Sequence, residues 1–257
     1  MKRLVVIHAT ASGPHLLGRA LLPLGGKPLL VRMIERVRAA RTRCDVVVAT
    51  TRRPDDDDLL LVTREAGVPI FRGKPAPLLV TFHEQARLFG ADVVAALSAR
   101  AALIDPFVID EVFGTLERTA CDYASNLCPA TFPDGMGVCA MRVDTIDALR
   151  GGAPASVARP LPRRTAQGAS FHVENVRFFG ADLSRTVKLA VDNREDYERV
   201  RDVFDALYTE EHPAFSLRAM LDHLARERTG LDPARGLVRT RLETHHQANS
   251  PEARGVV

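Results

Sequence analysis

Apolar residues in the first half of the chain gather in four short runs, and longer stretches with the spacing of amphipathic helices separate them. The runs are rich in valine, isoleucine and leucine, which is typical of strands buried on both faces of a parallel sheet. The alternation of strand and helix predicts right-handed crossovers and a mostly parallel α/β sheet. The predicted strands are 4–7, 44–50, 67–72 and 91–97, and the predicted helices are 28–41, 55–66, 78–89 and 106–119.

The second half has a different pattern, with short segments, turns and a stretch rich in proline, arginine and glycine. We expect that stretch, at 151–168, to be a mobile loop or an extended arm. One domain is predicted over 1–234, with an inserted arm at about 120–185, followed by a loose tail at 235–257. The remaining predictions are strands at 123–126, 138–142 and 187–191, and helices at 143–149, 170–179, 193–207 and 216–228.

Composition narrows the function classes. Of the 257 residues, 46% are hydrophobic and 26% charged, which is typical of a globular protein. The formal net charge is only +3, tryptophan is absent, and no basic stripe interleaves with aromatic residues, which argues against nucleic-acid binding. The four cysteines lack zinc or redox spacing, so free thiols are expected. With no signal peptide and no apolar run of membrane-spanning length, we expect a cytoplasmic protein without a membrane partner.

The strongest candidate for a ligand site is the stretch 3–27, which reads as strand, glycine-bearing loop and helix start. This order can place phosphate groups at a helix N-terminus, although neither the dinucleotide nor the Walker pattern is present. A plain connection between strand and helix is the alternative. In parallel sheets, ligands bind outside the carboxyl ends of the strands. We therefore expect 8–19, 50–53 and 98–102 to share one rim of the sheet.

Several short motifs follow one another in a fixed order through most of the chain. They include Leu-Gly-Gly-Lys-Pro-Leu-Leu at 24–30, Gly-Val-Pro-Ile-Phe-Arg-Gly at 67–73, Thr-Phe-Pro-Asp-Gly at 131–135 and Val-Asp-Asn-Arg-Glu-Asp at 191–196. In these motifs the chain resembles the acylneuraminate cytidylyltransferase-like proteins, specifically the spore-coat polysaccharide biosynthesis protein F branch. The resemblance implies a three-layer nucleotidyltransferase fold, GT-A-like and Rossmann-like. It also implies nucleotide transfer from CTP to a sugar, with pyrophosphate leaving.

The resemblance implies a nucleotide subsite, and it is there that the chain departs from the family. In the first loop only Gly18 and a cation, Arg19, are kept. Arg100 stands where the family has its metal-binding aspartate, and a guanidinium cannot be a ligand of Mg²⁺. We therefore assign no metal ligand. Mg²⁺ remains a candidate cofactor, although the substitution at Arg100 disfavours it. The implied nucleotide-binding residues are His8, Ala9, His15, Gly18, Arg19, Lys27, Thr50 and Ser98.

The acceptor side of the implied pocket is kept, and Arg100 and Asp192 form the implied catalytic pair. In one interpretation Arg100 neutralises phosphate in place of a metal. The protein then handles a CTP- or CDP-type nucleotide, or a sugar nucleotide, together with an acidic or amino sugar. In the other, catalysis is lost and the protein is a binding or assembly subunit. The implied substrate-binding residues are Ser125, Asn126, Thr131, Asp134 and Gly135.

Four of these residues also have purely structural interpretations. Arg100 can pair with Asp192 in place of a phosphate. Asp192 can cap the helix at 193–207 in place of binding a metal, and Asp134 can make a turn. His8 can be a hydrogen-bonded histidine at the rim, in place of a base or phosphate ligand.

For the whole protein, a homodimer formed through the inserted arm is expected.

Overall fold

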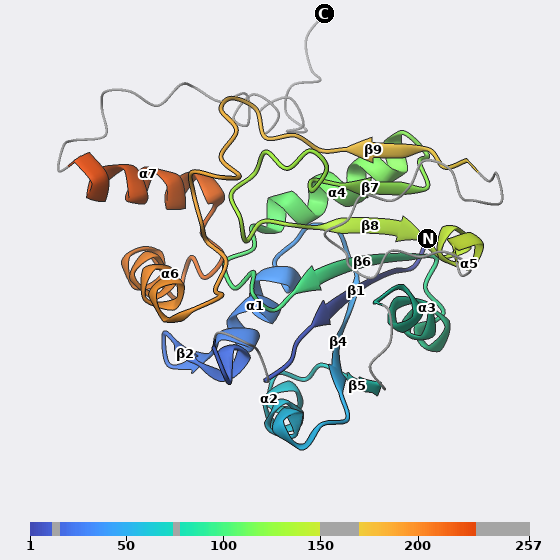
Figure 1. Cartoon of the computed structure of the whole chain (residues 1–257), viewed down its shortest axis with the longest axis horizontal. Coiled ribbons are helices and arrows are strands. Elements are labelled where there is room, and N and C mark those ends of the chain that lie inside the picture. Colours follow the sequence, from blue (N-terminus) through green and yellow to red (C-terminus); the bar gives the residue numbers. More distant parts are fainter. Residues whose placement is uncertain (12–15, 74–77, 150–169, 230–257) are drawn as a thin grey trace, which may run out of the picture.

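A seven-stranded sheet runs through the middle of the molecule in the order β5-β4-β1-β6-β8-β7-β9 (Figure 1). The computed structural model describes residues 1–11, 16–73, 78–149 and 170–229. The stretch 151–168, predicted as a mobile loop or an extended arm, the predicted tail at 235–257 and His15 lie outside the described residues. The strands are β1 (Arg3–His8), β4 (Asp45–Thr51), β5 (Ile70–Gly73), β6 (Val93–Ser98), β7 (Tyr123–Ser125), β8 (Cys139–Arg142) and β9 (Val173–Asn175).

The sheet is mostly parallel, which confirms the predicted fold class. Strands β1, β4, β5 and β6 run in the same direction, and β7 and β9 also pair in parallel. Only β8 runs opposite to its two neighbours, β6 and β7. The carboxyl ends of β1, β4 and β6 therefore meet at one edge, where the connecting loops gather.

Helices cover both faces of the sheet (Figure 1). On one face lie α3 and α5, and on the other lie α1, α4 and α6. Short 3₁₀ turns, η1 (Arg19–Leu21) and η2 (Pro54–Asp56), follow β1 and β4, and a small hairpin pairs β2 (Pro23–Leu24) with β3 (Lys27–Pro28). The helices are α1 (Leu29–Arg38), α2 (Asp58–Glu65), α3 (Leu78–Phe89), α4 (Pro106–Arg118), α5 (Val143–Leu149), α6 (Arg194–Leu207) and α7 (Leu217–Thr229).

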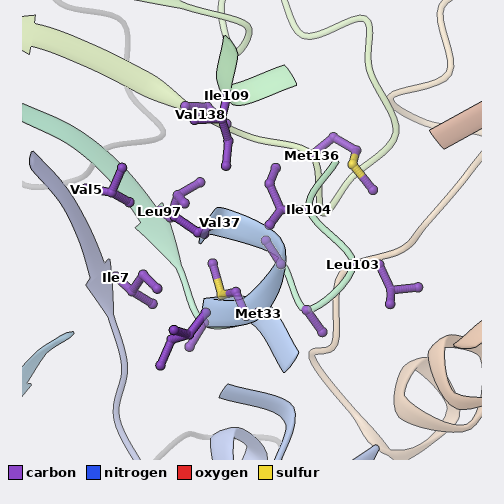
Figure 2. Packing of buried hydrophobic residues seen from close by; sticks show 14 of the residues in the cluster. Val5, Ile7, Met33, Val37, Leu97, Leu103, Ile104, Ile109, Met136 and Val138 are labelled. Atoms are coloured by element: carbon purple, nitrogen blue, oxygen red, sulfur yellow. The ribbon is translucent and has the colours of Figure 1, made fainter. Parts of the chain in front are cut away.

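The buried run of β1 feeds two hydrophobic clusters, because successive side chains of a strand point to opposite faces. Val5 and Ile7 join the cluster with Met33 of α1, as Figure 2 shows. Leu4 and Val6 join the cluster under α3 and α5. This two-sided burial explains why the strand reads as a continuous apolar run. Among the described residues, no helix is both long enough and apolar enough to cross a membrane.

Most predicted elements are present, with ends shifted by a few residues. The helices predicted at 78–89 and 143–149 have the observed bounds of α3 and α5. Asp105 caps α4 as predicted, accepting a hydrogen bond from the Phe107 N–H at 2.9 Å. Pro28 lies in the short strand β3, and α1 begins at the next residue.

Two predictions for the second half are wrong. The segment 170–179 is not a helix, because 173–175 pairs in parallel with β7 as the outermost strand, β9. The segment 187–191 is not a strand of the sheet, and its only β-type pairing in the described residues is a single bridge between Lys188 and Asp134. It runs instead across the loops at the strand ends, so its apolar residues are buried against loops and helices.

Candidate functional site

The candidate site lies at the edge of the sheet where β1, β4 and β6 end. The strand register places His8 beside Ala49 of β4 and beside Ser98 of β6. Thr50 is buried next to Ala49, and Ala9 continues the ladder by donating its N–H to the Ala49 carbonyl at 3.0 Å. The structure thus brings four predicted nucleotide-binding residues to one rim, because parallel strands end at the same edge.

Arg100 lies two residues beyond β6, at the centre of this edge. Its Nη2 donates to Oδ2 of Asp134 at 2.8 Å and to Oδ2 of Asp192 at 2.7 Å. The side chain is 36% exposed, so solvent reaches the guanidinium even though one nitrogen is bridged. The structure thus shows the pairing with Asp192 and adds Asp134 as a second partner.

Two further cations approach the same carboxylates. Nζ of Lys188 lies 3.1 Å from Asp192 and 2.7 Å from Asp196, and Nη1 of Arg19 lies 3.6 Å from Asp192. Cations and carboxylates therefore alternate along this edge, and Nη1 of Arg199 also approaches Asp196, at 3.3 Å. We refer to the following residues as the strand-end ion cluster: Arg19, Arg100, Asp134, Lys188, Asp192 and Asp196.

Backbone contacts bring Asp134 and Asp192 to Arg100. Gly135 has a φ of +103°, and a Cβ there would lie 2.5 Å from the backbone carbon of Leu189, so only glycine allows this approach. The Leu189 N–H donates to the Asp134 carbonyl at 2.7 Å, and the Val191 N–H donates to the Arg100 carbonyl at 2.9 Å. Asp134 therefore lies in a turn, which the Met136 N–H closes by donating to the Pro133 carbonyl at 3.1 Å, and its carboxylate also contacts Arg100.

The possibility that Asp192 caps α6 is wrong, because Asn193 is the cap. The Asn193 side chain accepts from the Asp196 N–H at 2.9 Å, and Asp196 Oδ2 accepts from the Asn193 N–H at 3.3 Å. Asp196 also accepts from the Asp192 N–H at 3.1 Å. This capping box fixes the Asp192 backbone and leaves its carboxylate for Arg100.

Sequence reasoning missed Lys188 and Asp196. Burial would raise the pKa of Asp196, but the bond from Lys188 and the backbone N–H groups outweigh it, so the pKa is lowered. The hydrogen bond to Asp196 raises the pKa of Lys188. The spacing of Asn193 and Asp196 is the signature of a capping box, and it was the signal that could have revealed Asp196.

Arg19 reaches the cluster because of Gly18. Gly18 has a φ of +64°, in the left-handed region, and the chain then turns into η1. Nη1 of Arg19 donates to the Val191 carbonyl at 2.9 Å. Burial lowers the pKa of Arg19, the nearby Arg100 lowers it further, and Asp192 opposes both. An anionic ligand between the two guanidinium groups would therefore be stabilised.

Asp56 lies behind the rim, and its charge acts on His8. Burial lowers the pKa of His8, and the charge of Asp56 opposes that effect. Asp56 is fully buried and accepts from the Ala11 N–H at 2.7 Å, from the Thr51 N–H at 3.3 Å and from the Thr51 hydroxyl. Burial would raise the pKa of Asp56, but these hydrogen bonds outweigh it and the pKa is lowered. No local pattern in the run 55–58 indicates that one of its acids is buried.

Two of the predicted substrate-binding side chains, Asn126 and Thr131, have structural partners in the loop that carries Asp134. Nδ2 of Asn126 donates to the Met136 carbonyl at 2.7 Å, and its Oδ1 accepts from the Val138 N–H at 2.8 Å. The Thr131 hydroxyl accepts from the Phe178 N–H at 2.7 Å. These bonds shape the loop that carries Asp134, so contact with a substrate stays a prediction.

Ser125 and Lys27 are not members of the ion cluster. Ser125 is buried at the end of β7. Lys27 is exposed, and its Nζ lies 2.6 Å from Oε1 of Glu35 in α1. Glu35 also pairs with Nη1 of Arg32 at 3.0 Å, so Lys27 shares its carboxylate partner with a second cation.

Comparison with known proteins decides the family. The profile of the family described as Cytidylyltransferase matches residues 5–136, just over half of the chain. The chain belongs to the cytidylyltransferase family. An uncharacterized protein of Methanocaldococcus jannaschii is 27% identical to this cytidylyltransferase-family chain over 126 residues. That match covers 49% of this chain and 52% of the relative, so the chain spans about half the length of the relative.

Solved structures share the cytidylyltransferase fold. A cytidylyltransferase from Leptospira borgpetersenii serovar Hardjo-bovis has a TM-score of 0.79 at 21% identity, covering 93% of this chain and 100% of that chain. A CMP:2-keto-3-deoxy-manno-octonic acid synthetase complexed with CTP has a TM-score of 0.59 at 16% identity, covering 81% and 100%. At these identities the likeness shows the fold alone.

A divalent metal does not fit the donor set of this cytidylyltransferase-family site. Mg²⁺ requires several oxygen ligands in octahedral geometry. Here Nη2 of Arg100 lies 2.8 Å from the carboxylate of Asp134 and 2.7 Å from that of Asp192, so a cationic donor already occupies both oxygen acceptors. In the parts of the chain that the structure describes, no group of three or more His, Cys, Asp or Glu residues could hold a metal ion. No step of the chemistry is therefore assigned to a metal.

Proposed function

We propose that this cytidylyltransferase-family protein binds a cytidine nucleotide or a sugar nucleotide at the strand-end ion cluster, without a required metal. The observation that carries the proposal is the guanidinium of Arg100 between Asp134 and Asp192. We place the protein in the acylneuraminate cytidylyltransferase-like branch, in surface or specialised carbohydrate biosynthesis, with an acidic or amino sugar as acceptor. The motifs retained at 131–135 and 191–196 support this placement.

The proposed reaction needs positive charge at the phosphates. A sugar hydroxyl oxygen attacks the α-phosphorus of CTP and forms the new P–O bond. The bond to pyrophosphate breaks, pyrophosphate keeps its electron pair, and the hydroxyl proton passes to solvent. Negative charge grows on the departing group and must be stabilised. Both carboxylate bonds of Arg100 use Nη2, and within the described residues Nη1 has no carboxylate partner. Nη1 of Arg100 and the guanidinium of Arg19 are therefore the groups that we assign to phosphate binding.

A second candidate function is a non-catalytic binding or assembly subunit. The observation that favours it is the same pairing, because Arg100 is already neutralised by two carboxylates. A ligand phosphate must then compete with Asp134 and Asp192 for the guanidinium. Binding of nucleotide without pyrophosphate release would support this second function.

The test is thermal stabilisation by CTP, CDP and a CMP-sugar, each with Mg²⁺ and with EDTA. A ligand at a hundred times its Kd stabilises the folded state by about 2.7 kcal/mol. We expect equal shifts with Mg²⁺ and with EDTA, and loss of the shift in Arg100→Ala. Arg43→Ala, which removes an exposed arginine before the amino end of β4, is the matched control and keeps the shift.

Three outcomes decide between the functions. A shift that needs Mg²⁺ contradicts the proposed role of Arg100. A metal-independent shift with pyrophosphate release from CTP and an acidic sugar supports transfer, and one without release supports the subunit. Absence of a shift with every nucleotide contradicts nucleotide binding altogether.

We also propose one domain over 1–234, a homodimer through the arm at about 120–185, and a cytoplasmic location. The resemblance supports the dimer. Light scattering of the full chain tests it, because a monomeric mass across the micromolar range would contradict the dimer.

A further inference from the structure

Asp56 joins the loops that follow β1 and β4. Its Oδ1 accepts from the Ala11 N–H at 2.7 Å, and its Oδ2 accepts from the N–H and the hydroxyl of Thr51. The Thr51 hydroxyl also accepts from the Arg53 N–H at 3.2 Å. A fully buried carboxylate with this many donors is held in one position, because losing any donor leaves a buried charge under-satisfied.

The contact at Ala11 continues to the strand-end ion cluster. The Ala11 carbonyl accepts from the Gly18 N–H at 2.7 Å. Gly18 is the left-handed residue before Arg19, and η1 then packs against α2. Arg19 in turn donates to the Val191 carbonyl, next to Asp192. One series of short contacts thus runs from Asp56 to the cation that faces Asp192.

We infer that Asp56 is the positioning residue of the first loop, setting the place of Arg19 at the ion cluster through Ala11 and Gly18. Asp56 does not face the ligand, because it is fully buried behind the rim. The groups that face it are Ala11, Thr51 and the side chains of His8 and Thr50. Its effect on nucleotide affinity rests on the proposed function, whereas its effect on the loop does not.

Asp56→Asn is the decisive variant because it preserves shape. An amide has one acceptor oxygen and one NH₂ donor, so it can satisfy the Ala11 N–H or the Thr51 N–H, but not both. Asp55→Asn is the matched control, because Asp55 is the neighbouring acid, is exposed and carries the same charge. A difference between the two variants reflects the position of the acid and not the lost charge.

The first measurement is amide hydrogen exchange at Ala11 and Gly18 by NMR. We expect both amides to exchange at least tenfold faster in Asp56→Asn and at the wild-type rate in Asp55→Asn. Unchanged exchange in Asp56→Asn would overturn the inference. If Asp56→Asn does not fold, Thr51→Val removes one donor to the same carboxylate, and faster exchange at the same two amides is again expected.

The second measurement is the Kd for CTP, corrected for the folded fraction, in a double-mutant cycle. Asp56→Asn is expected to weaken binding at least tenfold, and Arg19→Ala by at least as much. Because Asp56 acts through Arg19, the double variant should bind no more weakly than Arg19→Ala alone. The inference would be overturned if the double variant lost affinity for CTP by the product of the two single losses. It would also be overturned if Asp56→Asn bound CTP as tightly as Asp55→Asn.

A purely structural role gives a different result. It would lower the midpoint of thermal unfolding and leave the corrected Kd unchanged. If the wild type binds none of CTP, CDP and the CMP-sugar, the proposed function fails, and the exchange rates of Ala11 and Gly18 still decide whether Asp56 positions the loop.

Discussion

His8 shows how a single half-buried side chain makes stability depend on pH. Burial lowers its pKa below the ordinary value of 6.5 in the folded protein. As pH falls below 6.5, the unfolded chain therefore takes up a proton before the folded chain does, and the free energy of unfolding decreases. Above pH 6.5 His8 is mostly neutral in both the folded and the unfolded chain and leaves the free energy of unfolding unchanged, so stability is lost only on the acid side.

We expect His8→Gln to reduce this acid-side loss of stability. Urea denaturation at pH 7.5 and pH 5.5 measures it, as the drop in unfolding free energy between the two values. The wild type should show the larger drop, because glutamine has no proton to take up. Equal drops in the two proteins would contradict the shifted pKa of His8.

Asp56 makes a second prediction for the same imidazole. The negative charge of Asp56 stabilises the protonated ring and opposes the effect of burial. Asp56→Asn removes that charge, so the pKa of His8 should fall further. An NMR titration of the His8 ring in both proteins measures the change, and a higher pKa in the variant would contradict the arrangement.

At the scale of the element, the start of α6 links helix capping to the candidate site. The capping box of Asn193 and Asp196 satisfies backbone N–H groups that no helical carbonyl reaches. The same Asp196 carboxylate accepts from the Asp192 N–H. A cap whose sequence signature is local therefore also positions an acid of the ion cluster.

Asn193→Ala should lower the free energy of unfolding by about 1 kcal/mol, which is the usual cost of losing such a cap. Asn193→Ser, which keeps a capping oxygen, is the control and should lie within a few tenths of a kcal/mol of the wild type. Urea denaturation of the three proteins measures both values. An alanine variant as stable as the serine variant would show that the cap contributes nothing.

At the scale of the whole molecule, Arg36 of α1 ties the first helix to the C-terminal part of the described chain. Its Nε donates to the Ile104 carbonyl at 2.8 Å, its Nη2 to the Phe215 carbonyl at 2.6 Å, and its guanidinium stacks on the Phe215 ring. Burial lowers the pKa of Arg36 to about 10. The side chain remains charged at neutral pH while spanning the space between distant segments.

Arg36→Met should lower the free energy of unfolding by about 2–4 kcal/mol, because buried carbonyls lose their donors while the apolar volume is roughly kept. Arg43→Met, which changes an exposed arginine, should stay within about 0.5 kcal/mol of the wild type. Urea denaturation measures both variants. A loss in Arg36→Met no larger than in Arg43→Met would contradict its anchoring role.

Local patterns correctly predicted two kinds of element: those whose contacts are made by residues close in the chain, and strands that are buried on both faces. The apolar run in β1, the helical spacing of α3 and the cap at Asp105 each carry their signal within a few residues. The segments 170–179 and 187–191 were predicted wrongly, because contacts with β7 and with distant loops override their local preference. Periodicity cannot register a partner that lies fifty residues away.

The candidate site divides in the same way. The sequence by itself determined that the strands of the first half are parallel, and therefore that His8, Thr50 and Ser98 share one rim. Its short motifs indicated a cytidylyltransferase-like fold. Only the tertiary structure decided that Arg100 bridges two carboxylates and that Asp56 is buried against Ala11. The physical reason is separation along the chain: Arg100 meets Asp192 across 92 positions, and Ala11 meets Asp56 across 45. Folding of the whole sheet and its loops brings such charges together, and no local spacing records it.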